Sequence, residues 1–348
     1  MGTQLKNKVS IIIPHCNHYS ILDECLKSLK NISYKNIEII VVDNNSTDDS
    51  FLSLNENHKD IIVQRSKTNL GYAGGCNLGA SIATGEYLLF LNNDTIHDKF
   101  FLTILVEELD NDKSLACIQP KIKNYNNKEF FDYAGASGGF IDYLVFPFCR
   151  GRIFNTIEKD DNQYESKIKV FWTSGTAFLT RKILFNKLEG FDQGLFAHME
   201  EIDFSWKCYL AGYTCMVNPG SVIYHHGGKT LGYNSPYKTY LNHRNSMILL
   251  LTNYNILRSL ILFPLRIVLE IISSVNDLFK LRIFHFFAHY AALISLFNIF
   301  YLYKRRKLNK KIRKVSDISL FNENILFTKS IVIKYFLKKI RTFNQLEI

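Results

Sequence analysis

Three clusters of polar and acidic residues in this 348-residue chain directly follow short apolar runs. The clusters are Pro14-His15-Cys16-Asn17, Asp43-Asn44-Asn45-Ser46 and Asn92-Asn93-Asp94. Carboxylate and amide oxygens are the ligands that hard divalent cations prefer, and they also hydrogen-bond polar ligands. Asn, Asp and Ser are also common in turns, so each cluster taken alone is better explained as a turn. Their recurrence after successive apolar runs favours a ligand site.

A fourth cluster is more acidic and opens an expected helix. It reads His198-Met199-Glu200-Glu201-Ile202-Asp203, and the helix is predicted over 203–211 with Gly212 as its stop. A carboxylate at such a place can accept a proton as a general base. Alternatively, the acids only complement the positive N-terminal end of the helix dipole.

The first 120 residues alternate between strand and helix signals, which predicts an α/β fold. Expected strands lie at 9–13, 37–42, 61–63 and 87–91, and expected helices at 21–29 and 73–83. Strands without polar alternation, separated by helices, indicate a parallel sheet that is covered on both faces. Ligands bind beyond the carboxyl ends of such strands, which is where the three strand-end clusters lie.

Composition and charge narrow the class of protein. With 47% apolar and 21% charged residues, the chain has the composition of a folded protein and not of a disordered one. Seven dispersed cysteines without a C-x-x-C pair predict reduced thiols in a cytosolic setting, and we expect no secretory signal in the N-terminal residues. The net charge of +10 is confined to residues 304–348, which hold 13 Lys and Arg against 3 Asp and Glu.

Residues 246–348 are predicted to form a helical region that associates with a membrane. Residues 283–303 carry no charged side chain over 21 residues, a length that can span a bilayer. Their bulky aromatic residues also suit a helix in the membrane interface, and the basic block KRRKLNKKIRK (304–314) suits anionic lipid. We therefore expect peripheral or monotopic association with the cytoplasmic face of the cell membrane.

Three alternatives remain for this region. It is a true membrane span, a helical hairpin that covers the preceding domain, or the contact of a homodimer. Nucleic-acid binding is disfavoured, because no nucleic-acid-binding motif accompanies the basic block.

Five ordered motifs resemble those of family 2 inverting glycosyltransferases, which have the GT-A fold. They lie within residues 8–245 and read VSIIIPHCN, IEIIVVDNNSTDDS, NLGYAGGCNLGASIATGEYLLFLNNDT, TSGTAFLTRK and EGFDQGLFAHMEEIDFSWKCYLAGYTCMVNPGSVIYHHGG. Within the family, L-N-N-D-T is most similar to the rhamnosyltransferase-like group. The resemblance implies a Rossmann-like nucleotide-sugar-binding domain with a mostly parallel central sheet over residues 1–245, followed by the helical region 246–348.

The resemblance also implies a divalent cation, Mn2+ or Mg2+, that bridges the diphosphate of a nucleotide-sugar donor and stabilises it as a leaving group. The family's D-x-D motif falls on Asn92-Asn93-Asp94, so Asp94 is the implied metal ligand. A metal-binding histidine of the family falls on His225. Alternatively, His225 and His226 are an ordinary core or surface pair. Replacement of the first acid of the motif by Asn92 lowers the expected metal affinity.

The remaining site residues follow from the same resemblance. The implied donor-binding residues are Pro14, His15, Asp43, Asn44, Gly71, Asn77, Asn93 and Asp94. The implied acceptor or sugar-pocket residues are Trp172, Gly175 and Arg244, although Trp172 also suits the core. Glu201 falls on the catalytic base, and Glu200 and Asp203 are the other catalytic candidates.

These features predict an inverting glycosyltransferase. It transfers a sugar, with rhamnose among the candidates, from a UDP- or dTDP-linked donor to a hydroxyl of a lipid-linked or cell-surface glycan. The alternative function is a non-catalytic nucleotide-sugar-binding or scaffold subunit of a membrane glycan-assembly complex, which the incomplete D-x-D motif suggests.

Overall fold

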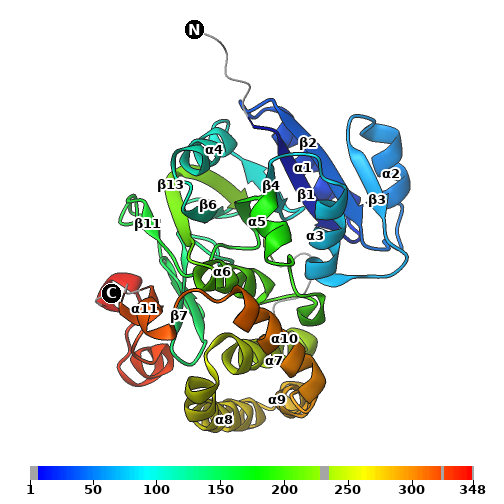
Figure 1. Cartoon of the computed structure of the whole chain (residues 1–348). Coiled ribbons are helices and arrows are strands. Elements are labelled where there is room, and N and C mark those ends of the chain that lie inside the picture. Colours follow the sequence, from blue (N-terminus) through cyan, green and yellow to red (C-terminus); the bar gives the residue numbers. More distant parts are fainter. Residues whose placement is uncertain (1–6, 228–234, 323–324, 347–348) are drawn as a thin grey trace.

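The computed structural model describes residues 7–227, 235–322 and 325–346 and shows an α/β fold built on one large central sheet (Figure 1). The strand order is β11-β13-β6-β12-β4-β1-β2-β3. The strands are β1 Val9–His15, β2 Ile37–Asp43, β3 Ile62–Arg65, β4 Tyr87–Leu91, β6 Leu115–Asn124, β11 Ile168–Lys169, β12 Ala177–Arg181 and β13 Thr214–His225. β1 is parallel to β2 and β4, β2 to β3, and β13 to β6, whereas β12 is antiparallel to both of its neighbours. The prediction of a mostly parallel sheet is confirmed.

Helices cover both faces of this sheet (Figure 1). α3 (Gly71–Ile82) shares a core with Ile12 and Phe90 on one face. α1 (Tyr19–Lys30) and α4 (Phe101–Asn111) share a second core with Ile11 and Leu89 on the other face. Neighbouring residues of β1 and β4 therefore point into different cores, and both positions must be apolar. This double burial explains why the strands lack polar alternation.

Sheet register brings the polar clusters together. His15 and Asp43 are paired residues of β1 and β2, so these strands end at the same edge of the sheet. β4 lies beside β1 and is followed directly by the Asn92-Asn93-Asp94 cluster. The short strand β5 (Thr95–His97) then pairs with β13, and the backbone N–H of His226 donates a 3.0 Å hydrogen bond to the carbonyl of Asp94.

A smaller sheet and a group of helices form the other half of the molecule (Figure 1). The smaller sheet has the order β10-β9-β8-β7-β14, with β7 Gly139–Asp142, β8 Pro147–Cys149, β9 Arg152–Ile153, β10 Thr156–Ile157 and β14 Leu326–Phe327. The longer helices are α6 Glu200–Leu210, α7 Pro236–Asn253, α8 Ile256–Phe279, α9 Ile283–Ser295 and α10 Ile299–Ile312. The shorter helices α11 Asp317–Asn322, η1 Gln193–Leu195, η2 Ile333–Leu337 and η3 Phe343–Leu346 complete the list, whereas α2 Ser50–Asn57 and α5 Lys182–Lys187 contact strands β3 and β12 of the large sheet.

The uncharged run over 283–303 is divided between two helices. α9 and α10 meet at a bend of 67°, and only when taken together do they have the length and composition of a membrane span. Among the described residues, no single helix is long and apolar enough to cross a bilayer. The domain boundary that we predicted at residue 245 falls inside α7. The division of the chain into two domains at this residue stays a prediction.

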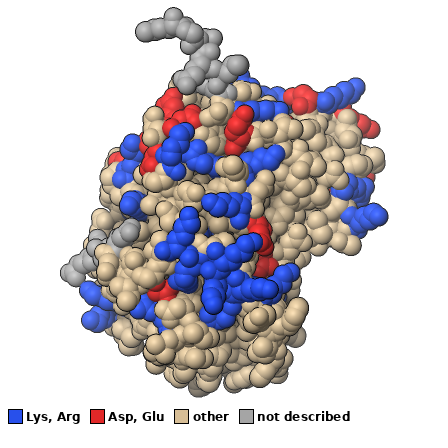
Figure 2. Space-filling view, in the orientation of Figure 1, with Lys and Arg blue, Asp and Glu red and all other residues tan. Residues whose placement is uncertain are grey.

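The basic block on α10 consists of an exposed part and a buried part. Figure 2 shows Lys and Arg side chains gathered on the face of the molecule where α10 lies in Figure 1. The exposed members are Lys304, Lys307, Lys310, Lys311 and Lys314. Arg305 is buried and pairs with Asp192 and Asp203, and Arg313 pairs with Asp317 at 2.6 Å. Arg305 is therefore not available to anionic lipid, and the contact of the exposed lysines with lipid stays a prediction.

Candidate active site

A cavity of about 1140 Å³ lies at the carboxyl edge of the parallel strands. The residues that line it and were predicted from the sequence are Pro14, His15, Asn44, Gly71, Asn93, Asp94, Trp172, Gly175, Glu200, Glu201 and His225. Its volume exceeds what a single drug-sized ligand usually needs. It continues beyond the sheet to α7, α8 and η2, so it has room for a donor and part of an acceptor.

Asp94 and His225 line one corner of the cavity, and Asp132 contacts His225 from behind. Nε2 of His225 lies 3.0 Å from Oδ1 of Asp94, and Nδ1 of His225 lies 2.9 Å from Oδ1 of Asp132. All three side chains are buried. The Asp132 contact fixes the orientation of the imidazole, as outer-shell carboxylates do for metal-binding histidines. Asp132 was not predicted, because it lies in a loop between β6 and β7 that carries none of the quoted motifs.

The electrostatics of this corner favour a cation. Burial opposes ionisation of Asp94, but the attraction of His225 outweighs it and holds the pKa of Asp94 below its usual value. Burial likewise disfavours a charged His225, yet Asp94 and Asp132 hold its pKa well above the usual value. Within the described part of the chain, Oδ1 of Asp94 has no partner besides the imidazole of His225. One carboxylate oxygen and one imidazole nitrogen thus converge, and they fit a divalent cation, which would take the place of the proton on Nε2 of His225.

The donor side of the cavity is formed by the ends of β1 and β2. Nδ1 of His15 accepts a 2.8 Å hydrogen bond from the Asn93 amide, and burial lowers the pKa of His15 to about 4, so the ring is neutral. The Asn44 amide donates to the carbonyl of Gly71 at 2.9 Å. Asp43 is placed differently from the prediction, because it does not line the cavity and Oδ2 of Asp43 lies 3.1 Å from Nε of Arg65.

Gly71 and Asn77 support the cavity through the segment that precedes α6. Gly71 has φ +68°, and a Cβ at this position would lie 2.4 Å from the carbonyl oxygen of Phe196, so only glycine fits. Asn77 does not line the cavity. Its side chain donates to the carbonyl of Phe191 at 2.8 Å and accepts from the Phe191 N–H at 3.0 Å. The structure therefore replaces the predicted donor contact of Asn77 by a contact that positions a loop.

Glu200 and Glu201 are presented by a strained turn before α6. Phe196, His198 and Met199 all have positive φ, between 65° and 73°. Such conformations cost free energy in residues other than glycine and are concentrated at functional sites. The helix begins at Glu200, three residues earlier than predicted, and the stop at Gly212 is confirmed by its φ of +87°.

The strained turn is held by residues of α7. The Asn245 amide donates hydrogen bonds of 2.7–3.0 Å to the carbonyls of Leu195, Ala197 and His198. Arg244 donates to the carbonyls of residues 194 and 195 and does not line the cavity. The predicted contact of Arg244 with substrate is therefore replaced by a contact that positions the turn.

Burial separates the roles of the two glutamates. It raises the pKa of Glu201 to about 7. It raises the pKa of Glu200 well above the usual value, and the charge of Glu201 raises it further. Two carboxylates so close together do not both ionise near neutral pH. One carboxylate of the pair is thus available near pH 7, as a general base requires, and Glu201 is the more exposed of the two.

Asp203 lies outside the cavity, and its carboxylate is paired with cationic side chains of the protein. Its carboxylate is fully buried and lies 2.8 Å from Lys207 and 2.6 Å from Arg305. Burial opposes its ionisation, but these two cations hold the pKa of Asp203 well below the usual value. The prediction that Asp203 is a catalytic candidate is corrected, because both carboxylate oxygens face cations of the protein.

Trp172 and Gly175 form part of the cavity wall. The indole N–H of Trp172 donates a 2.9 Å hydrogen bond to the carbonyl of Phe140, and its ring lies where a Cβ on Gly139 would sit. The carbonyl of Gly175 accepts from the hydroxyl of Tyr72. Trp172 therefore packs in the core and also lines the cavity. Only the edge of its ring that faces the cavity is available to a ligand.

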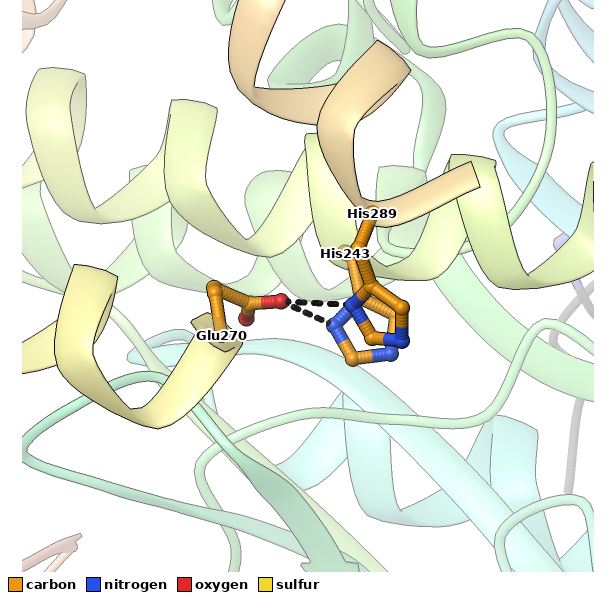
Figure 3. A group of neighbouring side chains, drawn as sticks. All are labelled: His243, Glu270 and His289. Atoms are coloured by element: carbon orange, nitrogen blue, oxygen red, sulfur yellow. Dashed lines mark hydrogen bonds and ion pairs between the residues drawn. The ribbon is translucent and has the colours of Figure 1, made fainter. Parts of the chain in front are cut away.

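A buried network joins α7, α8 and α9 at the far end of the cavity. His243 and His289 both direct Nδ1 at Oε2 of Glu270, at 2.6 and 3.1 Å (Figure 3). The spacing of these three groups resembles that of metal ligands. However, Arg266 donates to the other oxygen of Glu270 at 2.8 Å, and Asp277 lies 3.3 Å from Nε2 of His289. The carboxylate of Glu270 is already neutralised, so we interpret the cluster as an ion-pair network that fixes the three helices.

The sequence profile described as "Glycosyl transferase family 2" matches residues 10–188, which is more than half of the chain. The chain belongs to this family. The predicted resemblance is confirmed, and with it the GT-A-like fold. This family 2 chain is 28% identical over 143 residues to "Glycosyltransferase GlyG" of Streptococcus pneumoniae, which is 39% of this chain and 44% of that protein. It is 20% identical over 243 residues to "N-acetylglucosaminyl-diphospho-decaprenol L-rhamnosyltransferase" of Mycobacterium tuberculosis, which is 66% of this chain and 79% of that protein.

Solved structures of low sequence identity share the fold. "GalNAc-T7 with UDP, GalNAc and Mn2+" has a TM-score of 0.56 at 18% identity and covers 71% of this chain and 48% of that one. "Mannosyltransferase PcManGT from Pyrobaculum calidifontis in complex with GDP-Man and Mn2+" has a TM-score of 0.51 at 14% identity and covers 84% of this chain and 87% of that one. The family 2 chain spans less than half the length of GlyG and 56% of a glycosyltransferase of Haemophilus influenzae that it also resembles.

Proposed function

We propose that this family 2 chain is an inverting glycosyltransferase that moves a sugar from a nucleoside-diphosphate donor to a hydroxyl of a lipid-linked or cell-surface glycan. One observation carries the proposal. A cation-binding pair, Asp94 and His225, and an ionisable carboxylate, Glu201, come from distant parts of the sequence and line the same cavity. These are the two chemical functions that a displacement at an anomeric carbon needs.

The donor half of the reaction rests on the strand ends. Asn44, His15 and Asn93 offer amide and imidazole groups to the nucleotide. Asp94 and His225 would hold a divalent cation, Mn2+ or Mg2+, and Asp132 would keep the imidazole oriented. The cation supplies positive charge that stabilises the nucleoside diphosphate as it leaves.

The acceptor half rests on Glu201. Its carboxylate accepts the proton of the acceptor hydroxyl as the hydroxyl oxygen attacks the anomeric carbon. The bond from that carbon to the diphosphate oxygen breaks on the opposite side, so the configuration inverts. Glu201 ends protonated and returns the proton to solvent. Glu200, which holds its proton near neutral pH, does not compete for the role.

The test compares Asp94→Asn with a matched control, Asp60→Asn. Asp60 is an exposed acid that lies 3.8 Å from the ammonium group of Lys30. Release of nucleoside diphosphate from a panel of UDP-, dTDP- and GDP-sugars is measured with and without Mn2+ or Mg2+. We expect metal-dependent turnover that Asp94→Asn removes and Asp60→Asn keeps. Donor binding without turnover on any sugar or glycan would instead support the non-catalytic subunit.

We also propose that the chain associates peripherally with the cytoplasmic face of the cell membrane through α8, α9 and the start of α10. These helices expose a series of large apolar side chains, namely Leu257, Leu260, Ile261, Val268, Ile272, Phe279, Phe284, Phe287, Ile294, Phe297 and Phe300. Soluble monomers seldom expose so many neighbouring apolar groups. The exposed lysines of α10 follow directly and suit anionic lipid.

The membrane proposal is tested with the double variant Phe284→Ser and Phe287→Ser, whose side chains are 78% and 60% exposed. Leu52→Ser on α2, which is 61% exposed, is the control. We expect the double variant, and not the control, to lose sedimentation with vesicles that contain anionic lipid. A stable homodimer in solution that the double variant disrupts would overturn the proposal and assign this surface to a second copy.

A further inference from the structure

Arg152 is a buried arginine without an acidic partner, and it faces the cavity. Its side chain is 8% exposed and lines the cavity close to α7. It donates to the carbonyl of Phe154 at 3.2 Å and to the sulfur of Cys149 at 3.5 Å, which is a weak acceptor. Its Nε has no hydrogen-bond partner, and no described carboxylate lies within ion-pair distance.

Other buried arginines show how the protein usually compensates this charge. Arg266 pairs with Glu270, and Arg305 pairs with Asp203. Arg150 has no carboxylate but donates five hydrogen bonds to neighbouring oxygens. Arg152 has neither form of compensation, and the ring of Tyr133, 4.4 Å from its guanidinium carbon, offers only a cation–π contact in their place. A buried guanidinium that has no ion pair and faces a cavity indicates an anionic ligand.

A second cation lies beside Arg152. Lys238 of α7 also lines the cavity, and its ammonium group lies 5.9 Å from the ring of Tyr133, the ring that Arg152 contacts at 4.4 Å. Burial lowers the pKa of Lys238, and the positive charge of Arg152 lowers it further, so the two cations repel each other. An anion between them relieves this repulsion. A phosphate group suits the pair, because it accepts paired hydrogen bonds from a guanidinium and a further one from an ammonium.

Arg152 is connected to an apolar part of the cavity wall. Phe154, which accepts from Arg152, has its ring 5.0 Å from that of Tyr335 and 5.3 Å from that of Phe336. Phe336 is 59% exposed. Phe336 and Ile272 of α8 both line the cavity, where it reaches the exposed apolar surface of α8 and α9. The cavity wall therefore combines a carboxylate, a cationic pair and exposed apolar side chains.

We propose that Arg152 and Lys238 bind a phosphate of an amphiphilic acceptor, a saccharide joined to a hydrocarbon chain through a phosphate or diphosphate. The saccharide hydroxyl reaches Glu201, and the hydrocarbon leaves past Phe336 and Ile272. This inference rests on the proposed function, and it names the acceptor class for the same cavity. The donor diphosphate also carries phosphate groups. The cation that Asp94 and His225 would hold already offers those groups a positive partner.

The test measures binding, so it does not depend on turnover. Octyl phosphate, below its micelle concentration, is titrated by calorimetry into the full chain saturated with Mn2+ and UDP, or with the nucleotide that binds best. Arg152→Gln should weaken octyl phosphate at least about tenfold, as expected for a lost charge-assisted hydrogen bond, and should change nucleotide affinity less than threefold. Lys238→Gln should act in the same direction. Lys113→Gln, an exposed lysine between α4 and β6, is the control and should have no effect.

Two further variants keep the test decisive. Arg152→Lys retains the charge and should retain part of the affinity even if Arg152→Gln folds poorly. Phe336→Ser should weaken octyl phosphate and leave inorganic phosphate unchanged.

The proposal is overturned if Arg152→Gln weakens the nucleotide and not octyl phosphate, because the pair then serves the donor. It is also overturned if octyl phosphate binds no better than inorganic phosphate. Octyl phosphate binding that depends on Arg152, in a chain that transfers no sugar, would uphold this site while the proposed transfer fails.

Discussion

Replacing Glu201 by Gln should abolish transfer and at the same time stabilise the protein. The side chain keeps its size and loses only the ability to hold a negative charge. Loss of a general base typically lowers the rate by about 10² to 10⁴. Binding of the donor should change little, because Glu201 belongs to α6 and the Asp94–His225 pair to the ends of β4 and β13.

The gain in stability follows from the pKa of Glu201. Burial raises this pKa from 4.5 to about 7, and a tenfold change in an acid dissociation constant corresponds to about 1.4 kcal/mol, so burying the charged form costs at most about 3 kcal/mol. The folded-state pKa is raised, so the wild-type protein bears no cost below pH 4.5, an increasing cost between pH 4.5 and 7, and the full cost above pH 7. Glu201→Gln has no such cost at any pH. Contact of the side chain with the cavity reduces the cost, so a gain of about 1 to 3 kcal/mol at pH 8 is expected.

The assay is urea denaturation of both proteins at pH 5 and pH 8, together with the pH dependence of kcat/KM for the wild type. We expect similar stability at pH 5, a more stable variant at pH 8, and a wild-type rate that rises with pH and reaches half of its maximum near pH 7. Glu200→Gln is the matched control and should keep most of the activity. Equal stability at both pH values, or a wild-type rate that is flat from pH 5.5 to 8.5, would refute Glu201 as a buried base.

Three further outcomes follow from the structure. Asp132→Ala should weaken Mn2+ binding by about 10- to 100-fold in a titration with nucleotide present, since His225 loses the partner that orients it; unchanged affinity would remove Asp132 from the metal site. Glu270→Gln should lower the free energy of unfolding by about 3 to 5 kcal/mol in urea denaturation, because it leaves a buried arginine unpaired; a loss below about 1 kcal/mol would contradict the network. Asp203→Asn should cost a similar free energy while the folded enzyme keeps its turnover, and a stable but inactive protein would restore Asp203 as a catalytic candidate.

The spacing of apolar residues along the sequence predicted the sheet well, because the central strands are buried on both faces. Ile12 and Ile11 point into different cores, and both must be apolar, so a parallel strand is recognisable from its own residues. The strand-end clusters were predictable for the same reason, since parallel strands end at one edge. His15 and Asp43 are indeed register partners.

Side-chain roles were less predictable where tertiary contacts decide between a ligand and a structural partner. Asp43, Asn77, Asp203 and Arg244 have the types of residue that bind substrate, but each is occupied by the protein itself. No local pattern distinguishes a carboxylate that faces a cavity from one that faces a buried arginine 102 positions away, as Asp203 faces Arg305. Asp132 was missed for the converse reason, because it gains its role only from His225, 93 positions away.

The contact between Asp203 and Arg305 also shows that helices of the C-terminal third of the chain help to position the candidate active site. Arg305 of α10 binds Asp203, which lies two residues after Glu201 on α6. Asn245 of α7 holds the strained turn that directly precedes Glu200. Removal of residues 246–348 would therefore leave Asp203 without Arg305 and cut α7 immediately after Asn245. Loss of activity in such a truncation would follow from misplacement of the base, whether or not these helices bind a membrane, so only surface substitutions on α8 and α9 separate the two roles.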